Sequence, residues 1–466
     1  MHRNKIQCLA KQVRRFRARF VQSVGAVLGN VVPQPSLVQW VSEEAGVYRE
    51  RIYNPFTTLT LFIEQVLGAD HSCQDAVARG LSARVALGQP PCSLNTGPYC
   101  KARSRLPLSL LTRLAREVGH RLCTGQPTAW RWRSRDVKLI DGTTVSMPDT
   151  SANQARFPQS RGQKPGLGFP MARLVAIVSL SAGAVLEWAM DACEGKKTGE
   201  TALLWRLMPH LQRGDVVIAD GYYCGYFMIA MLVTLGVDLI MPQHHLRITD
   251  FRRGKQLGVR DHVVTWIRPK RPDWMDEATY TRMPETLTMR EARAGGRTLI
   301  TTLTDARAVS KQELAQLYRY RWHVELDLRA IKTVMQMDIL RCKTPTMVEK
   351  EIAAHLLAYN LVRAVMAQGA FVANLLPRQL SFKAALQLLN AFEMNLRHCP
   401  RQRLARRHAP LIAGIASCRL RHRPGRVEPR VVKRRPKQHW LLTKPRHVLR
   451  ERLLKLQEQR VAASLR

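Results

Sequence analysis

Apolar residues recur with a helical period through the first quarter of the chain. They return every three or four positions, most clearly in residues 57–67 and 106–122. Thr57 or Thr58 is expected to cap the first of these two helices. The second carries several arginines, so the predicted helical N-terminal domain, residues 1–125, is either a DNA-binding domain or a helical domain with a solvated basic face.

From residue 137 the pattern changes to short runs rich in β-branched and apolar residues, separated by helical patterns. Three strands are expected first, then a helix, a strand, a second helix and a fifth strand. In chain order these elements cover residues 137–141, 172–180, 184–189, 199–211, 216–220, 226–235 and 237–241. This order predicts the α/β fold class, with a mixed sheet flanked by helices.

The alternation of predicted strands and helices ends after residue 241. The next seventy residues are rich in Thr, Arg and Pro and contain short alternating runs, which predicts a β-rich insertion. A helical period returns from Ser310 to about residue 336 and again over residues 348–367. The chain is therefore divided into a helical N-terminal domain, a core in two parts with an insertion between them, and a basic C-terminal region: residues 1–125, 126–241, 242–313, 314–370 and 371–466.

The charge is strongly positive and unevenly distributed. The 466 residues include 74 Lys+Arg and 35 Asp+Glu, a net charge of +39. Residues 1–20 have seven basic and no acidic residues, residues 397–466 have 21 basic and three acidic ones, and the remaining 376 residues carry only +14. Hydrophobic residues make up 45%, enough for a large core. These values indicate a folded protein whose partner is a polyanion, nucleic acid first, with two basic ends that contact phosphates.

The remaining composition argues against several other classes of protein. The ten cysteines form no CxxC pair, and no His cluster has zinc-ligand spacing, so reduced thiols in the cytoplasm, near the nucleoid, are expected. No stretch contains 18 uncharged apolar residues, so no membrane contact is expected. No apolar segment follows the basic N-terminus, which argues against a secretory signal, while an organelle transit peptide stays an alternative.

A polar stripe on the predicted helix 314–337 is the strongest chemical signal. At about 100° per residue its members fall within a sector of about 60°: Tyr318, Arg321, Glu325 and Lys332, with Arg329 close beside them. An adjacent apolar stripe would dock the helix on a core: Leu317, Val324, Leu328 and Ile331. Asp327 lies roughly opposite, so Glu325 is the better candidate acid. A carboxylate between a phenol and cations suits a metal ligand among phosphate-binding groups, although a salt-bridged amphipathic helix gives the same pattern.

Two predicted strands end in aspartate, at Asp141 and Asp220. Ligand sites gather at the strand ends of open α/β sheets. Together with Glu325 these residues make a set of three carboxylates, the ligands that Mg²⁺ prefers, and two such ions can clamp both oxygens of a phosphoryl transfer. The nearby Asp149 and Asp191 are expected to have surface or turn roles.

These residues resemble the DDE-type cut-and-paste transposases of the insertion-sequence-4 family. The family signature is Tyr, two residues, Arg, three residues, Glu, six residues, Lys, and the polar stripe matches it at every spacing. The sequence is similar to the family over most of the chain, from about Glu43 to the last basic helix. The similar stretches are residues 141–149, 215–220, 318–329, 341–345 and 355–363.

The resemblance implies an RNase H-like catalytic core with a β-rich insertion before the glutamate. It implies that Asp141, Asp220 and Glu325 are the catalytic acids and ligate two Mg²⁺ ions, for which Mn²⁺ can substitute. The substrate would be double-stranded DNA, both element ends and target, bound by a homodimer. Water attack would release a 3′-hydroxyl, which attacks the opposite strand to form a hairpin before the freed end is joined to target DNA.

The resemblance also assigns DNA contacts and reveals one departure. Tyr318, Arg321 and Lys332, with Arg329 beside them, would hold phosphates near the cleaved bond. Relatives can stack an aromatic residue of the insertion on a flipped base; Trp266 and Trp274 are candidates for this role or for simple packing. Relatives often have Arg after the second aspartate, where this chain has Gly221.

Three functions are therefore compared. The first is a transposase that cleaves and rejoins DNA. The second is a catalytically inactive derivative that only binds DNA, which the three intact acids disfavour. The third is a metal-dependent nuclease without strand transfer, which has no need of long basic ends.

Overall fold

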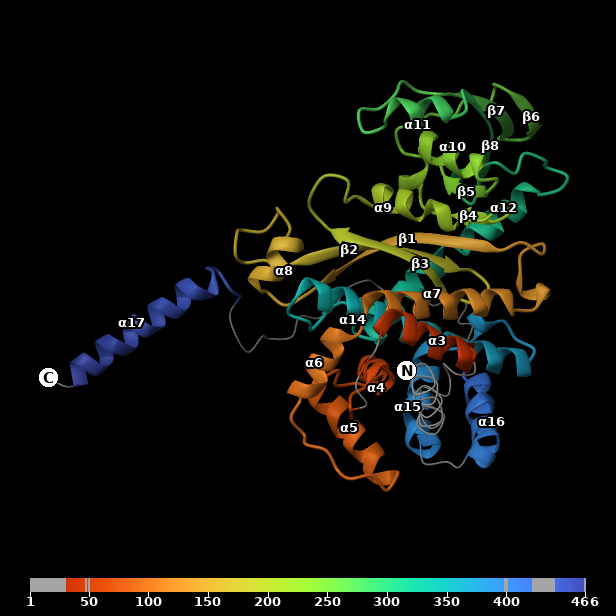
Figure 1. The fold of residues 1–466 in the computed structure, drawn as a ribbon. Coiled ribbons are helices and arrows are strands. Elements are labelled where there is room, and N and C mark those ends of the chain that lie inside the picture. The colour runs from red at the N-terminus through yellow and green to blue at the C-terminus, as the bar shows by residue number, and fades with distance from the viewer. Residues whose placement is uncertain (1–30, 47, 49–50, 398–400, 421–440, 465–466) are drawn as a thin grey trace, which may run out of the picture.

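A mixed sheet crosses the middle of the protein, and helices lie on both of its faces (Figure 1). The computed structural model describes residues 31–46, 48, 51–397, 401–420 and 441–464. The basic N-terminal segment, residues 1–20, and residues 421–440 of the basic C-terminal region lie outside the described residues. Within them the predicted α/β class with a mixed sheet is confirmed.

Nine strands form one sheet in the order β3-β2-β1-β4-β5-β9-β8-β7-β6. β1 is antiparallel to β2 and parallel to β4, and β4 is parallel to β5. The first five strands are β1 (Val137–Ser146), β2 (Met171–Ser179), β3 (Val185–Ala192), β4 (Val216–Ile218) and β5 (Asp238–Pro242). The short helix α8 (Ser151–Arg156) follows β1, and the helices α9 (Glu200–Leu207) and α10 (Tyr226–Thr234) connect β3 to β4 and β4 to β5. The predicted order of strands and helices is therefore present in the structure.

The other four strands and α11 lie in residues 242–313, where the β-rich insertion was predicted. They are β6 (Lys255–Gly258), β7 (Asp261–Ile267), α11 (Glu277–Arg282), β8 (Thr286–Ala294) and β9 (Arg297–Thr301). β9 is antiparallel to β5, with Ile240 opposite Thr301. The segment thus continues the central sheet instead of forming a separate one.

Within the described residues, five α-helices precede β1: α3 (Gln34–Ala45), α4 (Pro55–Leu67), α5 (Cys73–Ala86), α6 (Gly97–Arg105) and α7 (Leu108–Thr124). The expectation that Thr57 or Thr58 caps the first apolar helix was wrong. α4 begins earlier, and the Asn54 side chain accepts a hydrogen bond from the backbone N–H of Thr57 at 2.9 Å. Asn is as good an N-cap as Thr, and Pro55 suits the first helical position.

Three of the helices before β1, namely α3, α4 and α7, share a hydrophobic core with the sheet and with the long helix α14 (Pro345–Val372). Asn360 of α14 is buried at their junction. Its amide nitrogen donates to the carbonyl of Ala115 in α7 at 2.8 Å and to that of Val185 in β3 at 2.7 Å, and its oxygen accepts from the N–H of Val185 at 2.9 Å. Gly119 lets α7 approach β3, since a Cβ there would lie 2.3 Å from the Val185 carbonyl oxygen. A second core, on the opposite face, includes residues of α9 and α10.

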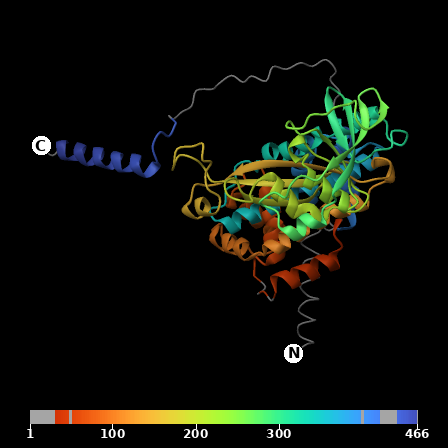
Figure 2. The same ribbon diagram turned by 90° about the horizontal axis from the view of Figure 1, so that it is seen from above.

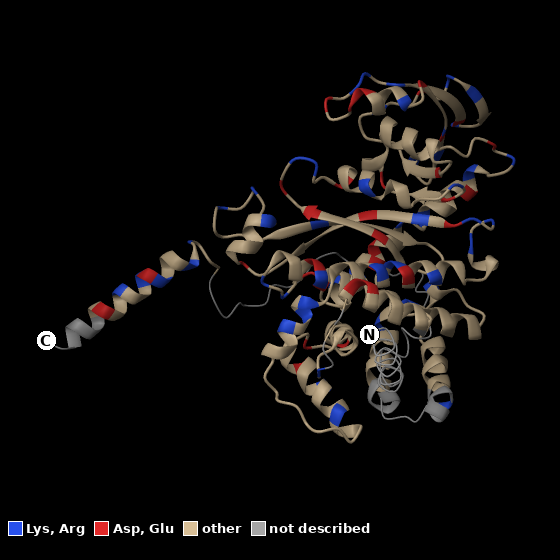
Figure 3. Ribbon diagram, viewed as in Figure 1, with Lys and Arg blue, Asp and Glu red and all other residues tan. Residues whose placement is uncertain are grey.

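The described residues after α14 are mostly helical. α15 (Phe382–Arg397) and α16 (Arg401–Ser417) pack near α14, whereas α17 (Arg446–Ser464) extends away from the rest in both views (Figures 1 and 2). Lys and Arg are spread over many helices and loops, and α17 carries residues of both signs (Figure 3). No helix of the described residues is long and apolar enough to cross a membrane.

Candidate active site

The strand β1 carries Asp141 within its length, not at its end. The expectation that this strand ends at Asp141 was wrong: β1 continues to Ser146, and Asp141 pairs with Ala176 of β2. Side chains alternate between the two faces of a strand, so Asp141 faces the same side as Leu139, which belongs to the larger core. Because α13 (Trp322–Arg329) packs against β1 on that side, Asp141 faces the helix that carries Glu325.

The parallel register of β1 and β4 explains why the two aspartates meet. Leu139 is opposite Ile218, so Asp141 and Asp220, each two residues further on, come to the same level along the two neighbouring strands. Asp220 follows β4 and caps a short turn, where its Oδ1 accepts the N–H of Tyr222 at 2.9 Å. The parallel pairing of β1 and β4 thus brings together two acids that are 79 positions apart in the sequence.

Glu325 lies on a helix that is interrupted on both sides. The prediction of one continuous helix over residues 314–337 was wrong. α12 (Lys311–Arg319) ends before Tyr320, α13 follows, and residues Ala330–Val334 form a π-helical turn. The predicted apolar stripe is buried throughout: Leu317, Val324, Leu328 and Ile331. The stripe therefore docks these helices as expected even though the α-helical hydrogen-bond pattern is not continuous.

Arg321 connects the acids. Its guanidinium donates to Glu325 Oε1, and its Nη1 lies 3.8 Å from Asp141 Oδ2. Burial raises the pKa of Asp141 to about 6, and the negative charges of Asp220 and Glu325 add to this rise, against the Gly142 N–H and Arg321, which lower the pKa. The three predicted acids therefore lie within electrostatic reach of one another.

The raised pKa of Asp141 predicts a pH-dependent stability. The pKa of Asp141 is higher in the folded protein than in the unfolded chain, so the folded protein binds the proton more tightly. The free energy of unfolding is therefore unaffected by ionisation of Asp141 below about pH 4, and it falls as the pH rises to about 6. We expect Asp141→Asn to raise the free energy of unfolding at pH 7.5 by up to about 3 kcal/mol, since each pKa unit is worth about 1.4 kcal/mol, and to add little at pH 4.5. Urea denaturation without divalent cations measures both values. Asp149→Asn, at an exposed position, is the control. An equal gain at both pH values would contradict the assignment.

The donor chemistry of the three acids suits a hard cation, because carboxylate oxygens are the ligands that Mg²⁺ and Mn²⁺ prefer. Among the residues described by the structure, however, no three such side chains lie close enough to hold a metal ion as they stand. The contacts of Arg321 supply the physical reason: it is paired with Glu325 and lies between that carboxylate and Asp141. The ion pair with Arg321 therefore competes with any cation for the Glu325 carboxylate.

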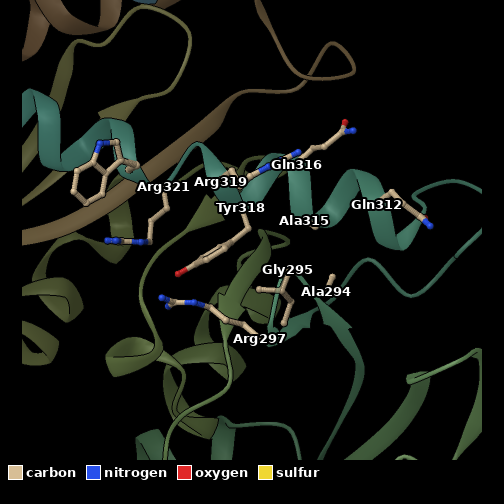
Figure 4. A pocket seen from close by; sticks show the side chains of 11 residues that line it. Ala294, Gly295, Arg297, Gln312, Ala315, Gln316, Tyr318, Arg319 and Arg321 are labelled. Atoms are coloured by element: carbon tan, nitrogen blue, oxygen red, sulfur yellow. The ribbon is translucent and has the colours of Figure 1, made fainter. Parts of the chain in front are cut away.

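The predicted DNA contacts fall into two groups. Tyr318 and Arg321 line a cavity of about 490 Å³ (Figure 4). The contacts of Arg321 with Glu325 and Asp141 connect this cavity to the acids. Burial is the main cause that raises the pKa of Tyr318, so its hydroxyl stays protonated and can donate. Arg329 is exposed and Lys332 is half-buried in the π-helical turn, and both lie outside the lining of this cavity.

The other acids and aromatics discussed above have structural contacts. Asp327 is fully buried and paired with Arg363 and Arg378, which explains its position opposite the polar stripe. Asp191 forms ion pairs with Arg156 and Arg206, each at 2.8 Å, and the exposed Asp149 accepts from Gln154. Trp266 is buried and donates to Glu291 at 2.8 Å, whereas Trp274 is exposed.

Glu200 lies beside the site but was not predicted from the sequence. A Cβ on Gly142 would lie 2.5 Å from the Glu200 Cδ, so this carboxylate is packed directly against the residue after Asp141. The Tyr223 hydroxyl donates to Glu200 Oε2 at 3.1 Å, and burial followed by Glu200 raises the pKa of Tyr223. Acids are common in the first turn of a helix, where they offset the helix dipole, so the sequence gives no reason to single this one out.

Comparison with known proteins agrees with the geometry. The family model described as Transposase DDE domain matches residues 132–361, the segment that contains Asp141, Asp220 and Glu325. The chain is 29% identical over 346 residues to the transposase InsG for insertion sequence element IS4 of Escherichia coli K12, covering 70% of this chain and 75% of that protein. It is also 35% identical over 69 residues to the transposase for insertion sequence element IS421 of Escherichia coli. That match covers 15% of this chain and 19% of the relative.

A solved structure also aligns with most of the chain. It is the cryo-EM structure of the piggyBac transposase synaptic complex with hairpin DNA, which aligns over 88% of both chains with 10% identity and a TM-score of 0.43. This likeness is too distant to support an inference about mechanism. The family match over the segment with the three acids, together with the relative that extends over most of the chain, decides the identity. The chain belongs to the insertion-sequence-4 family of DDE transposases, enzymes that cleave DNA and transfer the cleaved strand to a target.

Proposed function

We propose that Asp141, Asp220 and Glu325 are the catalytic acids of this transposase. The observation that carries the proposal is their convergence: the β1–β4 register aligns the aspartates, α13, which carries Glu325, packs against β1, and the charges of Asp220 and Glu325 both raise the pKa of Asp141. Their oxygen ligands suit two Mg²⁺ ions, or Mn²⁺, which when bound would stabilise the charge that develops on the attacking and leaving oxygens.

The core is proposed to be RNase H-like. Support comes from the strand order β3-β2-β1-β4-β5, in which β2 is antiparallel to its neighbours and β1, β4 and β5 are parallel. We propose residues 126–241 and 314–370 as the two parts of this core, with residues 242–313 as an insertion. Residues 1–125 would supply DNA contacts from their exposed surfaces, and residues 371–466 further basic contacts.

The reaction is proposed to begin with hydrolysis at each element end. Water attacks phosphorus, the bond from phosphorus to the 3′ oxygen breaks, and a 3′-hydroxyl remains. That hydroxyl attacks phosphorus on the opposite strand, which forms a hairpin and releases the flanking DNA; after the hairpin is opened by water, the 3′-hydroxyl attacks the target. Tyr318, Arg321, Lys332 and Arg329 would hold the phosphates in line, because planar guanidinium groups suit bidentate contacts with phosphate oxygens.

The test uses the purified full chain with DNA that carries the ends of its element. With Mg²⁺ we expect paired cleavage at both ends, a hairpin product that runs anomalously on a denaturing gel, and joining to a second DNA. Two ends must be held together, so a homodimer on DNA is expected in the complex, measurable by mass photometry. Binding without cleavage in both Mg²⁺ and Mn²⁺ would instead support an inactive derivative, and cleavage without joining a nuclease.

A further inference from the structure

The cavity that contains Tyr318 and Arg321 lies between α12 and the hairpin of β8 and β9 (Figure 4). The lining from the hairpin includes Arg297, and the lining from the helix side includes Arg319. In Figure 4 the Arg297 guanidinium points toward the Tyr318 hydroxyl, on the side of the cavity where Arg321 also ends. Arg297 of the insertion therefore lines the same cavity as Tyr318 and Arg321 of the core.

This cavity has an unbalanced positive charge. Its lining contains three arginines and no acid. Among the described residues, neither Arg297 nor Arg319 is paired with a carboxylate, and both are exposed. Two exposed arginines elsewhere in the insertion, Arg252 and Arg253, do pair with a carboxylate, that of Asp250. A cavity with unpaired guanidinium groups and a protonated phenol is suited to an anion.

The hairpin holds Arg297 in a defined place. Gly295 and Gly296 both have positive φ, 58° and 79°, the conformation that a two-residue hairpin turn of type I′ requires. Arg297 is the first residue of β9 and pairs with Ala294. β9 is bonded to β5, and β5 to β4, the strand that leads to Asp220. The sheet thus fixes the backbone of Arg297 relative to the strand that leads to Asp220.

We propose that this cavity binds a backbone phosphate of the DNA strand next to the cleaved bond, and that Arg297 is a positioning residue that holds this phosphate together with Tyr318. The inference rests on the proposed function, because it places the phosphate beside the three acids. Arg321 lines the same cavity while it pairs with Glu325, so the bound phosphate lies beside the group that connects the cavity to the catalytic acid. The contact is to the sugar-phosphate backbone and carries no sequence preference.

The first measurement is DNA binding in EDTA, by fluorescence anisotropy with end-containing DNA. We expect Arg297→Ala to weaken binding about tenfold and to reduce the slope of log affinity against log salt by about one, as for the loss of one phosphate contact. Arg297→Lys should keep the slope but recover only part of the affinity. The matched control is Arg282→Ala, an exposed arginine of the insertion outside the cavity, which should bind like the wild type. Equal binding by Arg297→Ala and the control would overturn the proposal.

The second measurement identifies the phosphate. Single phosphates around the cleaved bond are replaced by neutral methylphosphonates. At one of these positions we expect the methylphosphonate to weaken DNA binding by the wild type. Arg297→Ala, which already lacks this contact, should bind the modified and the unmodified DNA equally well. Equal losses for both proteins at every position would overturn the proposal. If inorganic phosphate raised the melting temperature of the wild type but not of Arg297→Ala, with equal methylphosphonate losses, the occupant would be free phosphate and the DNA assignment would be wrong. If the wild type did not cleave DNA but one methylphosphonate still weakened its binding more than that of Arg297→Ala, only the catalytic proposal would be wrong.

Discussion

Glu325→Ala is expected to abolish cleavage of the element ends and to leave DNA binding intact. Glu325 is the acid that α13 brings to β1, and Arg321, its ion-pair partner, remains available for phosphate when the carboxylate is lost. Removing one preorganised group that stabilises a transition state costs about 10²–10³-fold in rate, and a residue shared by every chemical step should cost at least that much. Binding is measured by anisotropy in EDTA, and cleavage on denaturing gels with Mg²⁺.

Two further variants make this result specific. Glu325→Gln keeps the shape and removes the charge, so it should be as inactive as Glu325→Ala if the carboxylate is what acts. Glu277→Ala, at a largely exposed glutamate of α11 paired with Arg271, should cleave like the wild type. Cleavage by Glu325→Ala within tenfold of the wild-type rate would contradict the role we propose for Glu325.

The second large effect concerns stability, at Asp327. This carboxylate is completely buried and pairs with Arg363 of α14 and with Arg378, whose Nη1 reaches both oxygens at 2.7 and 2.8 Å. Asp327→Ala would leave two buried guanidinium groups without their counter-charge. Removing one partner of a buried ion pair costs about 3–5 kcal/mol, because the remaining charge stays desolvated. We expect a loss of this size in the free energy of unfolding by urea.

A matched comparison is available on the surface. Asp250 also pairs with two arginines, Arg252 and Arg253, but those side chains are exposed and their attraction is screened by water. Asp250→Ala should therefore unfold at nearly the same urea concentration as the wild type. A loss below about 1 kcal/mol for Asp327→Ala would show that the two arginines find water or other partners, contrary to the view that this aspartate is what fixes α13 against α14.

The periodic pattern of the sequence was enough to predict the order of strands and helices along the chain. It did not predict where β1 ends. Asp141 is followed by Gly142 and two threonines, which look like a turn in isolation. The strand continues because β2 supplies partners for every residue up to Ser146, a contact between distant segments. The end of α12 at Arg319 could not be predicted either, because no Gly or Pro marks it in the sequence.

The candidate acids could be predicted because the family signature and the strand pattern lie in the local sequence. Arg297 and Glu200 could not. Arg297 belongs to a different element from Tyr318, and only the hairpin turn and the pairing of β9 with β5 bring it to the cavity. Trp266 shows the opposite case: an aromatic residue in the insertion suggests a base contact, whereas the fold buries it against Glu291.

The junction at Asn360 has a consequence for any attempt to divide this protein. Its amide holds α7 and β3 to α14, and the hydrophobic core runs without interruption from the helices before β1 to those after α14. A gene fragment that begins at β1 would expose the apolar faces of β3 and α14 to water. Deletions that remove α7 should therefore yield insoluble protein, and an exchange of DNA specificity between related elements would have to graft surface residues instead of whole domains.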